Sequence, residues 1–336
     1  MSISTASKKK FPLFKKTALA CSALLALSLS SCGIFVKRLP SGEVIHPTPG
    51  AVDHMVEVNG LKIHYAEYAG KGENVVMVHG FGSSSYSWER IAPIVQAKGY
   101  YIFVPDMKGF GWSEKPQKAK YDAYSLMEDV NDWMEKMGLT KVIYVGNSLG
   151  GAVGLLLTLE HPDKVERLIL IDAGGYPMKK PTIIKMASIP FSSEMVGCLY
   201  GKWIVKWNLG EVYYDSDKIR KEQVQAYYDR MRTRGHIDTQ VALSRAVDFE
   251  EFGKYIERVR AMEVKTLIIW GRDDQWIPLD KVGLRFQHDM KNSTLVVIPE
   301  CGHIPQEEKP EITARYIVDF LDGTPIEEYQ PKAARP

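Results

Sequence analysis

The strongest constraint on the fold is a series of short apolar runs that alternate with segments of helical spacing. The runs 75–78 (Val-Val-Met-Val) and 267–270 (Leu-Ile-Ile-Trp) are apolar at every position, which is typical of strands covered on both faces. Such an alternation predicts an α/β fold with right-handed crossovers and a mostly parallel, eight-stranded sheet with helices on both faces. The predicted strands are 55–59, 61–69, 74–79, 100–106, 141–145, 167–173, 265–271 and 293–299.

Composition excludes several classes of protein. Of the 336 residues 45% are hydrophobic and 25% are charged, which rules out a disordered, collagen-like or coiled-coil chain. The 43 Lys and Arg nearly balance the 41 Asp and Glu, giving a formal charge of +2. A surface that follows nucleic-acid phosphates needs a clear basic excess, so no nucleic-acid partner is expected.

The N-terminus has the features of an export signal at residues 1–31. Lysines at 8–10 and 15–16 precede an apolar stretch at 17–29, followed by small residues. The string Leu29-Ser30-Ser31-Cys32-Gly33 also resembles the lipobox of bacterial lipoproteins, whose cysteine is lipidated and becomes the first mature residue. This resemblance implies lipidation at Cys32 and a membrane-anchored lipoprotein of the cell envelope that faces the periplasm or the exterior.

An uncleaved membrane anchor is the alternative for the same segment. The run 17–36 is just long enough to cross a bilayer and is flanked by basic residues at 16 and 37–38. Both hypotheses place the folded domain outside the cytoplasm. Loss of the signal removes Cys21 and leaves Cys198 and Cys301, which we treat as free thiols.

Domain boundaries follow from proline, glycine and polar stretches. Residues 32–52 contain three prolines and predict a lipidated cysteine with a tether, and residues 324–336 predict a loose tail. The catalytic core is expected at 53–174 and 248–323. Between its two parts, residues 175–247 depart from strict strand alternation and predict a helical cap.

The string Gly146-Asn147-Ser148-Leu149-Gly150-Gly151 carries the first chemical signal. It follows a predicted strand and precedes a predicted helix at 149–161 that Pro162 ends. A strand, sharp turn and helix around G-x-S-x-G form the nucleophile elbow, in which glycines let neighbouring backbone segments pass close to a strained serine. Ser148 is therefore the candidate nucleophile.

From about residue 54 to 323 the chain resembles the α/β-hydrolase superfamily, of the serine esterase and lipase type. His79-Gly80-Phe81-Gly82 resembles the family's H-G-x loop, and the resemblance implies an oxyanion hole formed by the backbone N–H groups of Phe81 and Leu149. Residues 106–113 resemble the D-x-R-G-x-G-x-S segment, with Lys108 in place of arginine, and we interpret them as structural.

The candidate acid and base lie in two further segments that resemble motifs of the family. Residues 270–274 resemble the acid-bearing turn, with the motif position at Asp274, and residues 301–303 resemble the loop that carries His303. Ser148, Asp274 and His303 each follow a strand's C-terminal end, where open α/β sheets keep their sites. Asp172 and Asp273 remain open as alternative acids, since each also lies just after a strand.

The cap is rich in aromatic residues, and this favours a substrate with an apolar acyl or aromatic part. Many of these side chains are equally expected to pack the cap onto the core: Tyr200, Trp203, Trp207, Tyr213, Tyr214, Tyr227 and Tyr228. No spacing of cysteine and histidine resembles a zinc cluster, and no glycine-rich turn fits a dinucleotide or a phosphate. Neither a metal nor a cofactor is expected.

The sequence thus predicts hydrolysis of a small carboxylic ester through a Ser-His-Asp triad and an acyl-enzyme. The elbow also resembles that of carbon–carbon bond hydrolases of aromatic degradation, but Ile304 follows His303 where those enzymes usually carry tryptophan. Cofactor-free haloperoxidase or perhydrolase activity is a further alternative. A serine nucleophile argues against the dehalogenases and epoxide hydrolases of this fold, and a binding protein without turnover is the alternative from a different class.

Overall fold

The computed structural model describes residues 38–180, 184–185, 188 and 201–331. The predicted export signal and the cysteines at 32 and 198 lie outside these residues. Parts of the predicted cap and tail lie outside them as well.

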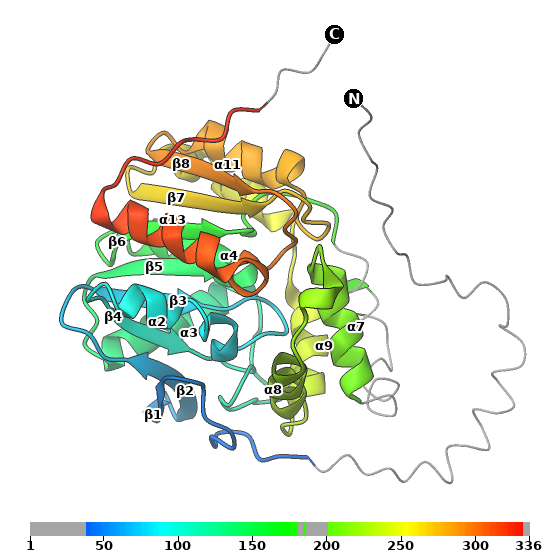
Figure 1. The fold of residues 1–336 in the computed structure, drawn as a ribbon. Coiled ribbons are helices and arrows are strands. Elements are labelled where there is room, and N and C mark those ends of the chain that lie inside the picture. The colour runs from blue at the N-terminus through cyan, green and yellow to red at the C-terminus, as the bar shows by residue number, and fades with distance from the viewer. Residues whose placement is uncertain (1–37, 181–183, 186–187, 189–200, 332–336) are drawn as a thin grey trace, which may run out of the picture. The chain divides into compact units, whose positions relative to one another are not determined.

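Eight strands form one sheet in the order β1-β2-β4-β3-β5-β6-β7-β8 (Figure 1). β1 pairs with β2 and β2 with β4 in antiparallel fashion, and all other pairs are parallel. The predicted mostly parallel, eight-stranded α/β fold is confirmed. The strands are β1 (Val52–Val58), β2 (Leu61–Tyr68), β3 (Asn74–Val78), β4 (Tyr101–Pro105), β5 (Val142–Asn147), β6 (Val165–Ile171), β7 (Lys265–Gly271) and β8 (Ser293–Ile298).

Helices cover both faces of this sheet because the central strands are apolar on both sides. In β3, Val75 and Met77 pack into the apolar layer on one face, and Val76 and Val78 pack into the layer on the other. The first layer contains α2 (Ala92–Gln96) and α13 (Pro310–Asp322). The second contains α3 (Ala123–Lys136), α4 (Leu149–Glu160), α10 (Ile256–Arg260) and α11 (Leu284–Asp289).

The chain between β6 and β7 contains the helices of the predicted cap region. In the described residues they are α7 (Lys202–Val212), η2 (Ser216–Lys218), α8 (Lys221–Met231), α9 (His236–Ala246) and η3 (Glu251–Tyr255). Side chains of α7 and α8 form an apolar cluster with Tyr86 and Ile304 of the core. Short elements next to the site are η1 (Ser85–Trp88), η4 (Leu279–Gly283) and α12 (Pro305–Glu308).

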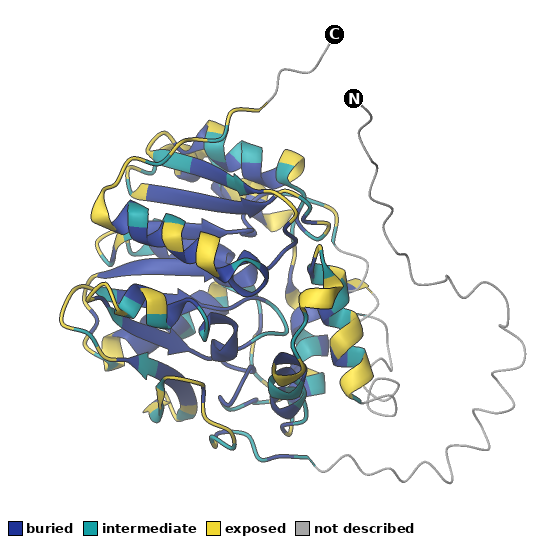
Figure 2. Ribbon diagram, in the orientation of Figure 1, coloured by how far each residue is buried: buried dark blue, intermediate teal, exposed yellow. Residues whose placement is uncertain are grey.

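The aromatic residues of the cap differ in burial. Tyr213 and Tyr227 are buried and pack the cap onto the core, which is the structural role we considered for them. Tyr228 is half-buried, whereas Trp203, Trp207 and Tyr214 are exposed. Tyr200 lies outside the described residues. Figure 2 shows exposed positions along α7.

The segment expected as a tether differs from that expectation after residue 38. The backbone N–H of Leu39 donates to the Arg232 carbonyl at 3.0 Å, and the N–H of Arg234 donates to the Leu39 carbonyl at 2.9 Å. Leu39 is also buried, so apolar contacts of its side chain and hydrogen bonds of its backbone both hold this segment against the folded domain. The expected loose tail differs too, because the Tyr329 N–H donates to the Leu295 carbonyl of β8 at 2.8 Å.

Among the described residues, no helix combines the length and the apolar character needed to span a bilayer.

Candidate active site

Ser148 lies at a sharp turn between β5 and α4. Its backbone has φ 54° and ψ −116°, a conformation that strains a residue with a side chain. A Cβ at Gly146 would lie 2.4 Å from the Gly150 carbonyl oxygen, and one at Gly150 would lie 2.3 Å from the Val78 carbonyl oxygen. Glycine is therefore required on both sides of Ser148, and the turn holds the serine at the carboxyl end of the sheet.

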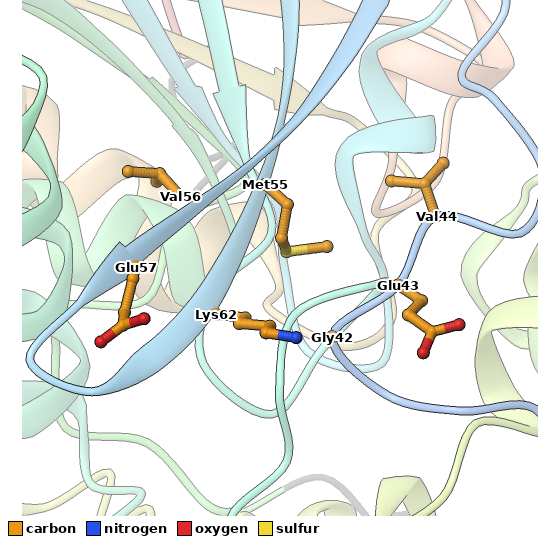
Figure 3. Close-up of a pocket in the computed structure, with 7 residues that line it drawn as sticks. All are labelled: Gly42, Glu43, Val44, Met55, Val56, Glu57 and Lys62. Carbon is orange, nitrogen blue, oxygen red and sulfur yellow. The ribbon is translucent and has the colours of Figure 1, made fainter.

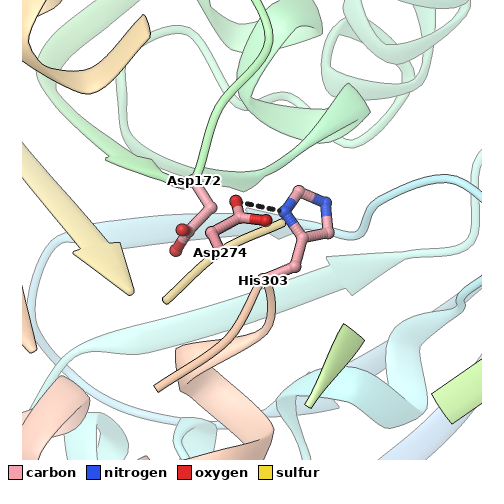
Figure 4. Close-up of side chains that lie close together, drawn as sticks. All are labelled: Asp172, Asp274 and His303. Atoms are coloured by element: carbon pink, nitrogen blue, oxygen red, sulfur yellow. Dashed lines mark hydrogen bonds and ion pairs between the residues drawn. The ribbon is translucent and has the colours of Figure 1, made fainter. Parts of the chain in front are cut away.

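His303 and Asp274 form a buried hydrogen-bonded pair (Figure 4). Nδ1 of His303 lies 2.7 Å from Oδ2 of Asp274. The other oxygen of Asp274 accepts from the backbone N–H groups of Trp276 at 2.7 Å and Ile277 at 3.1 Å. An ionised carboxylate can only accept, so Nδ1 carries the proton and Nε2 keeps its lone pair. The ring of Trp276 stacks on the imidazole with centroids 5.6 Å apart.

The backbone of His303 is fixed from two sides. The side-chain amide of Asn147, next to Ser148, donates to the His303 carbonyl at 3.1 Å and to the Ile171 carbonyl at 3.1 Å. The N–H of His303 donates to the carbonyl of Val212 at the end of α7, at 2.7 Å. The nucleophile turn and the cap therefore both position the histidine.

Glu308 ties the histidine loop to the cap. Its carboxylate accepts backbone N–H groups from Gly302 at 2.7 Å, Tyr214 at 3.1 Å and Asp215 at 2.8 Å. The sequence analysis missed this residue, because glutamates in a short turn are common on protein surfaces and nothing in the pattern signals burial.

Glu307 anchors α8 in the same region and was also missed. It accepts from the hydroxyls of Ser87 and Tyr227, both at 2.5 Å, and from the Gln223 side chain at 2.6 Å. Burial raises the pKa of Glu307 above its usual range, against the opposing effect of these hydrogen bonds. The cap is thus held on the core by polar contacts as well as by the apolar cluster.

The H-G-x loop lies directly against Ser148. A Cβ at Gly80 would lie 3.0 Å from the Ser148 Cβ. Nδ1 of His79 contacts the Gly80 carbonyl at 2.8 Å, and Nε2 of His79 accepts from the Met107 N–H at 3.1 Å. Burial lowers the pKa of His79, which keeps the ring neutral. His79 therefore braces the loop that presents Phe81, while Leu149 begins α4.

Asp106 organises the segment that we interpret as structural. It accepts from the backbone N–H groups of Ser85 at 2.6 Å and Trp112 at 2.7 Å, and it contacts Nδ1 of His64 at 2.7 Å. Burial raises the pKa of Asp106, but the charge and hydrogen bond of His64 outweigh burial and hold the pKa well below its usual range. Asp106 therefore stays ionised and fixes the turn that follows the H-G-x loop.

Of the three candidate acids, the structure brings Asp274 to His303. Asp273 is linked to the histidine loop through its backbone, since its N–H donates to the Cys301 carbonyl at 2.9 Å. Asp172 is fully buried at φ 42°, and both of its oxygens face the Gly271 N–H at 3.0 and 3.2 Å. Burial, together with the charge and hydrogen bond of Asp274, raises the pKa of Asp172 well above its usual range.

Asp172, Asp274 and His303 together are a potential set of metal ligands, with side-chain atoms within 4.8 Å of one another (Figure 4). In the structure His303 and Asp274 are bonded directly to each other, and the raised pKa of Asp172 favours its neutral form.

A separate surface hollow lies away from this cluster (Figure 3). It is lined by Gly42, Glu43, Val44, Met55, Val56, Glu57 and Lys62, which belong to the N-terminal segment, β1 and β2. None of these residues belongs to the site described above, so we do not assign the hollow to substrate.

The chain belongs to the family described as the alpha/beta hydrolase fold, whose model matches residues 73–193 and 200–310. This confirms the superfamily that the motifs around Ser148 and His303 indicated.

Several curated relatives are hydrolases. "Uncharacterized hydrolase YugF" of Bacillus subtilis is 31% identical over 268 residues, 79% of this chain and 96% of that protein. The 2-hydroxy-6-oxononadienedioate/2-hydroxy-6-oxononatrienedioate hydrolase of Comamonas testosteroni is 31% identical over 272 residues, 79% of this chain and 92% of that protein. A solved structure of a membrane phospholipase A is 26% identical with a TM-score of 0.66, and covers 82% of this chain and 87% of that one.

We predict that Asp172→Asn leaves catalysis nearly intact, with kcat/KM within about threefold of the wild-type value, because asparagine mimics a protonated carboxyl group. The unfolded chain ionises at residue 172 above about pH 4, whereas the native state resists ionisation. The wild-type protein should therefore lose stability relative to Asp172→Asn as pH rises above about 5, with a slope of at most about 1.4 kcal/mol per pH unit.

Urea unfolding of both proteins at several pH values measures this difference. Asp163→Asn, at an exposed turn, is the matched control and should show no such trend. A stability difference that stays constant with pH would show that Asp172 is ionised in the native state.

Proposed function

We propose that this chain is a serine hydrolase that attacks a carbonyl carbon with Ser148. The observation that carries the proposal is the buried hydrogen bond of 2.7 Å between His303 and Asp274, in a loop tied to the residue next to Ser148. His303 takes the proton of the attacking hydroxyl through Nε2, and Asp274 holds the imidazole in the tautomer that permits this.

The backbone N–H groups of Phe81 and Leu149 form the proposed oxyanion hole. Two observations support it: the loop before Phe81 packs against Ser148, and Leu149 is the first residue of α4. A helix N-terminus favours developing negative charge, and fixed donors stabilise the tetrahedral intermediate without reorganisation.

The proposed reaction has two stages. Ser148 adds to the carbonyl carbon, the bond to the leaving group breaks, and His303 returns the proton to that group. Water then adds to the acyl-enzyme with His303 again acting as base, which releases a carboxylic acid and the free Ser148 hydroxyl.

For the bond that is cleaved, we propose first a carbon–carbon bond next to a ketone, which the sequence analysis kept as its alternative. The support comes from curated relatives at 29–31% identity that are 2-hydroxy-6-oxo-dienoate hydrolases. A carbon leaving group needs a conjugated carbonyl to hold its electron pair, so the substrate must carry a second carbonyl or an enol conjugated with it.

Ester hydrolysis is the second candidate, and two observations favour it. Ile304 after His303 lies in the apolar cluster with cap residues Tyr213 and Tyr227, so the position next to the base is aliphatic. A membrane phospholipase A is among the similar structures. Both candidates use the same three side chains, and only the leaving group differs.

We also propose that the chain is exported and anchored through a lipid on Cys32. The support is the lipobox resemblance at 29–33 and the basic and apolar regions before it. A domain anchored in this way would face the periplasm or the exterior.

Ser148→Ala should lower kcat/KM by about 10³-fold or more on any substrate that the wild-type protein turns over. It should also abolish covalent labelling by a fluorophosphonate probe, because the probe reacts with the serine that His303 activates. The control variant Ser125→Ala, in α3, should keep both the wild-type kcat/KM and the labelling by the probe. Folded wild-type protein that fails to react with the probe would instead support a binding protein without turnover.

The bond class is tested by comparing substrates side by side. If the first candidate is right, kcat/KM for 2-hydroxy-6-oxo-6-phenylhexa-2,4-dienoate should exceed the value for p-nitrophenyl acetate, butyrate and octanoate by at least about tenfold. Efficient hydrolysis of the esters, with no consumption of the dienoate, would establish the ester candidate.

Cys32→Ser should abolish incorporation of an alkyne-tagged fatty acid when the chain is produced in a bacterium with the lipoprotein pathway. Cys21→Ser should retain incorporation, since residue 21 lies within the removed signal. A wild-type chain that stays in the membrane fraction without label would point to the uncleaved anchor.

A further inference from the structure

Two tryptophans on one face of α7 lie open to solvent. Trp203 is 59% exposed and Trp207 is 47% exposed, whereas Val205 and Leu209 on the inner face are 1% and 4% exposed. Residues four apart share a helix face, so the two indole rings form one patch. Exposed residues continue along much of α7 in Figure 2.

The exposure of Trp203 and Trp207 sets them apart from most other tryptophans of this chain. Four other tryptophans, at 88, 112, 133 and 270, are at most 1% exposed and form part of the core. Large aromatic side chains gain free energy when they leave water, so a pair of them on an outer helix face indicates a surface that something covers.

The chemistry of the patch fits a lipid surface. Indole rings are amphipathic and concentrate at the boundary between headgroups and acyl chains. Lys202 and Lys206 are exposed directly beside the two tryptophans, and lysines in such positions meet anionic headgroups. The exposed acidic residue of the helix, Glu211, lies one turn further towards its C-terminal end.

The described chain begins next to the same layer of helices. The apolar stretch 17–36 ends two residues before Arg38, and Leu39 is hydrogen-bonded to the end of α8 through Arg232. α8 packs on α7 through the apolar cluster that contains Val205 and Val224. The start of the described chain and the exposed tryptophans thus both belong to the cap side of the fold.

We propose that Trp203 and Trp207, flanked by Lys202 and Lys206, dock α7 on an anionic lipid bilayer. We call these four residues the α7 face. Val212 at the end of α7 accepts from the His303 N–H at 2.7 Å, so docking brings the site next to the lipid surface. The proposal depends neither on which bond is cleaved nor on whether Cys32 carries a lipid.

The test uses the full chain with Cys32→Ser, so that no lipid is attached, and vesicles of phosphatidylcholine with 30% or 0% phosphatidylglycerol. Adding Trp203→Ser and Trp207→Ser should lower the partition coefficient on anionic vesicles at least tenfold. The matched control adds Tyr124→Ser and Ile312→Ser, which remove apolar side chains exposed elsewhere, and should partition as the parent does. Lys202→Glu with Lys206→Glu should remove the preference for anionic vesicles.

Two further measurements keep the result interpretable. Fluorophosphonate labelling at the parent's rate shows that a variant is folded, independently of vesicle binding. A brominated phospholipid should quench tryptophan fluorescence in the parent and much less in the double tryptophan variant, whatever the N-terminal segment contributes to binding.

Equal partitioning and equal quenching for the double tryptophan variant and the control variant would overturn the proposal. A second result would overturn it as well: without lipid the parent is a dimer and the double tryptophan variant a monomer, while both partition equally onto vesicles. That result would assign the α7 face to self-association.

Discussion

The hydrogen bond between His303 and Asp274 depends on segments that are far apart in the sequence. Asp274 follows β7, His303 follows β8, and neither loop could hold its side chain alone. Backbone N–H groups of Trp276 and Ile277 fix the carboxylate, while Asn147, Val212 and Glu308 fix the histidine loop. Proton transfer needs an oriented imidazole, and these buried polar contacts together fix the orientation of the His303 ring.

These contacts connect the cap directly to the candidate site. Val212 and Tyr214 at the end of α7 bond to the histidine loop and to Glu308, and α8 bonds to Glu307 beside it. A shift of the cap would therefore also move the loop that carries His303.

Much of the fold and of the candidate site could be predicted because local patterns dictate it. The continuously apolar strands required cover on both faces, and the glycines around Ser148 permit the close backbone approach of a nucleophile turn. Asp274 and His303 could be proposed because their loops resemble family motifs and come after predicted strands. The hydrogen bonds of Glu307 and Glu308 could not be predicted from the sequence, and neither could the contact of Asp172 with Asp274. These interactions depend on which loops meet in space.

The predicted tether at 32–52 differs from the structure for a related reason. Prolines and glycines in residues 40–50 resemble a linker, yet Leu39 pairs with the loop after α8 and is buried. The bond class shows a different limit: an elbow and a triad are common to hydrolases of esters and of carbon–carbon bonds, so the leaving group must be inferred from relatives and from the cap.

The central claim is that Ser148, His303 and Asp274 act as one unit beneath the cap. A crystal structure of the protein inhibited by a phosphonate tests it most directly. We predict phosphorus bonded to Ser148 Oγ, its oxygen about 2.7–3.1 Å from the N–H groups of Phe81 and Leu149, and Nε2 of His303 within about 3.2 Å of Oγ. An adduct on another residue, or an imidazole turned away from Ser148, would contradict the account.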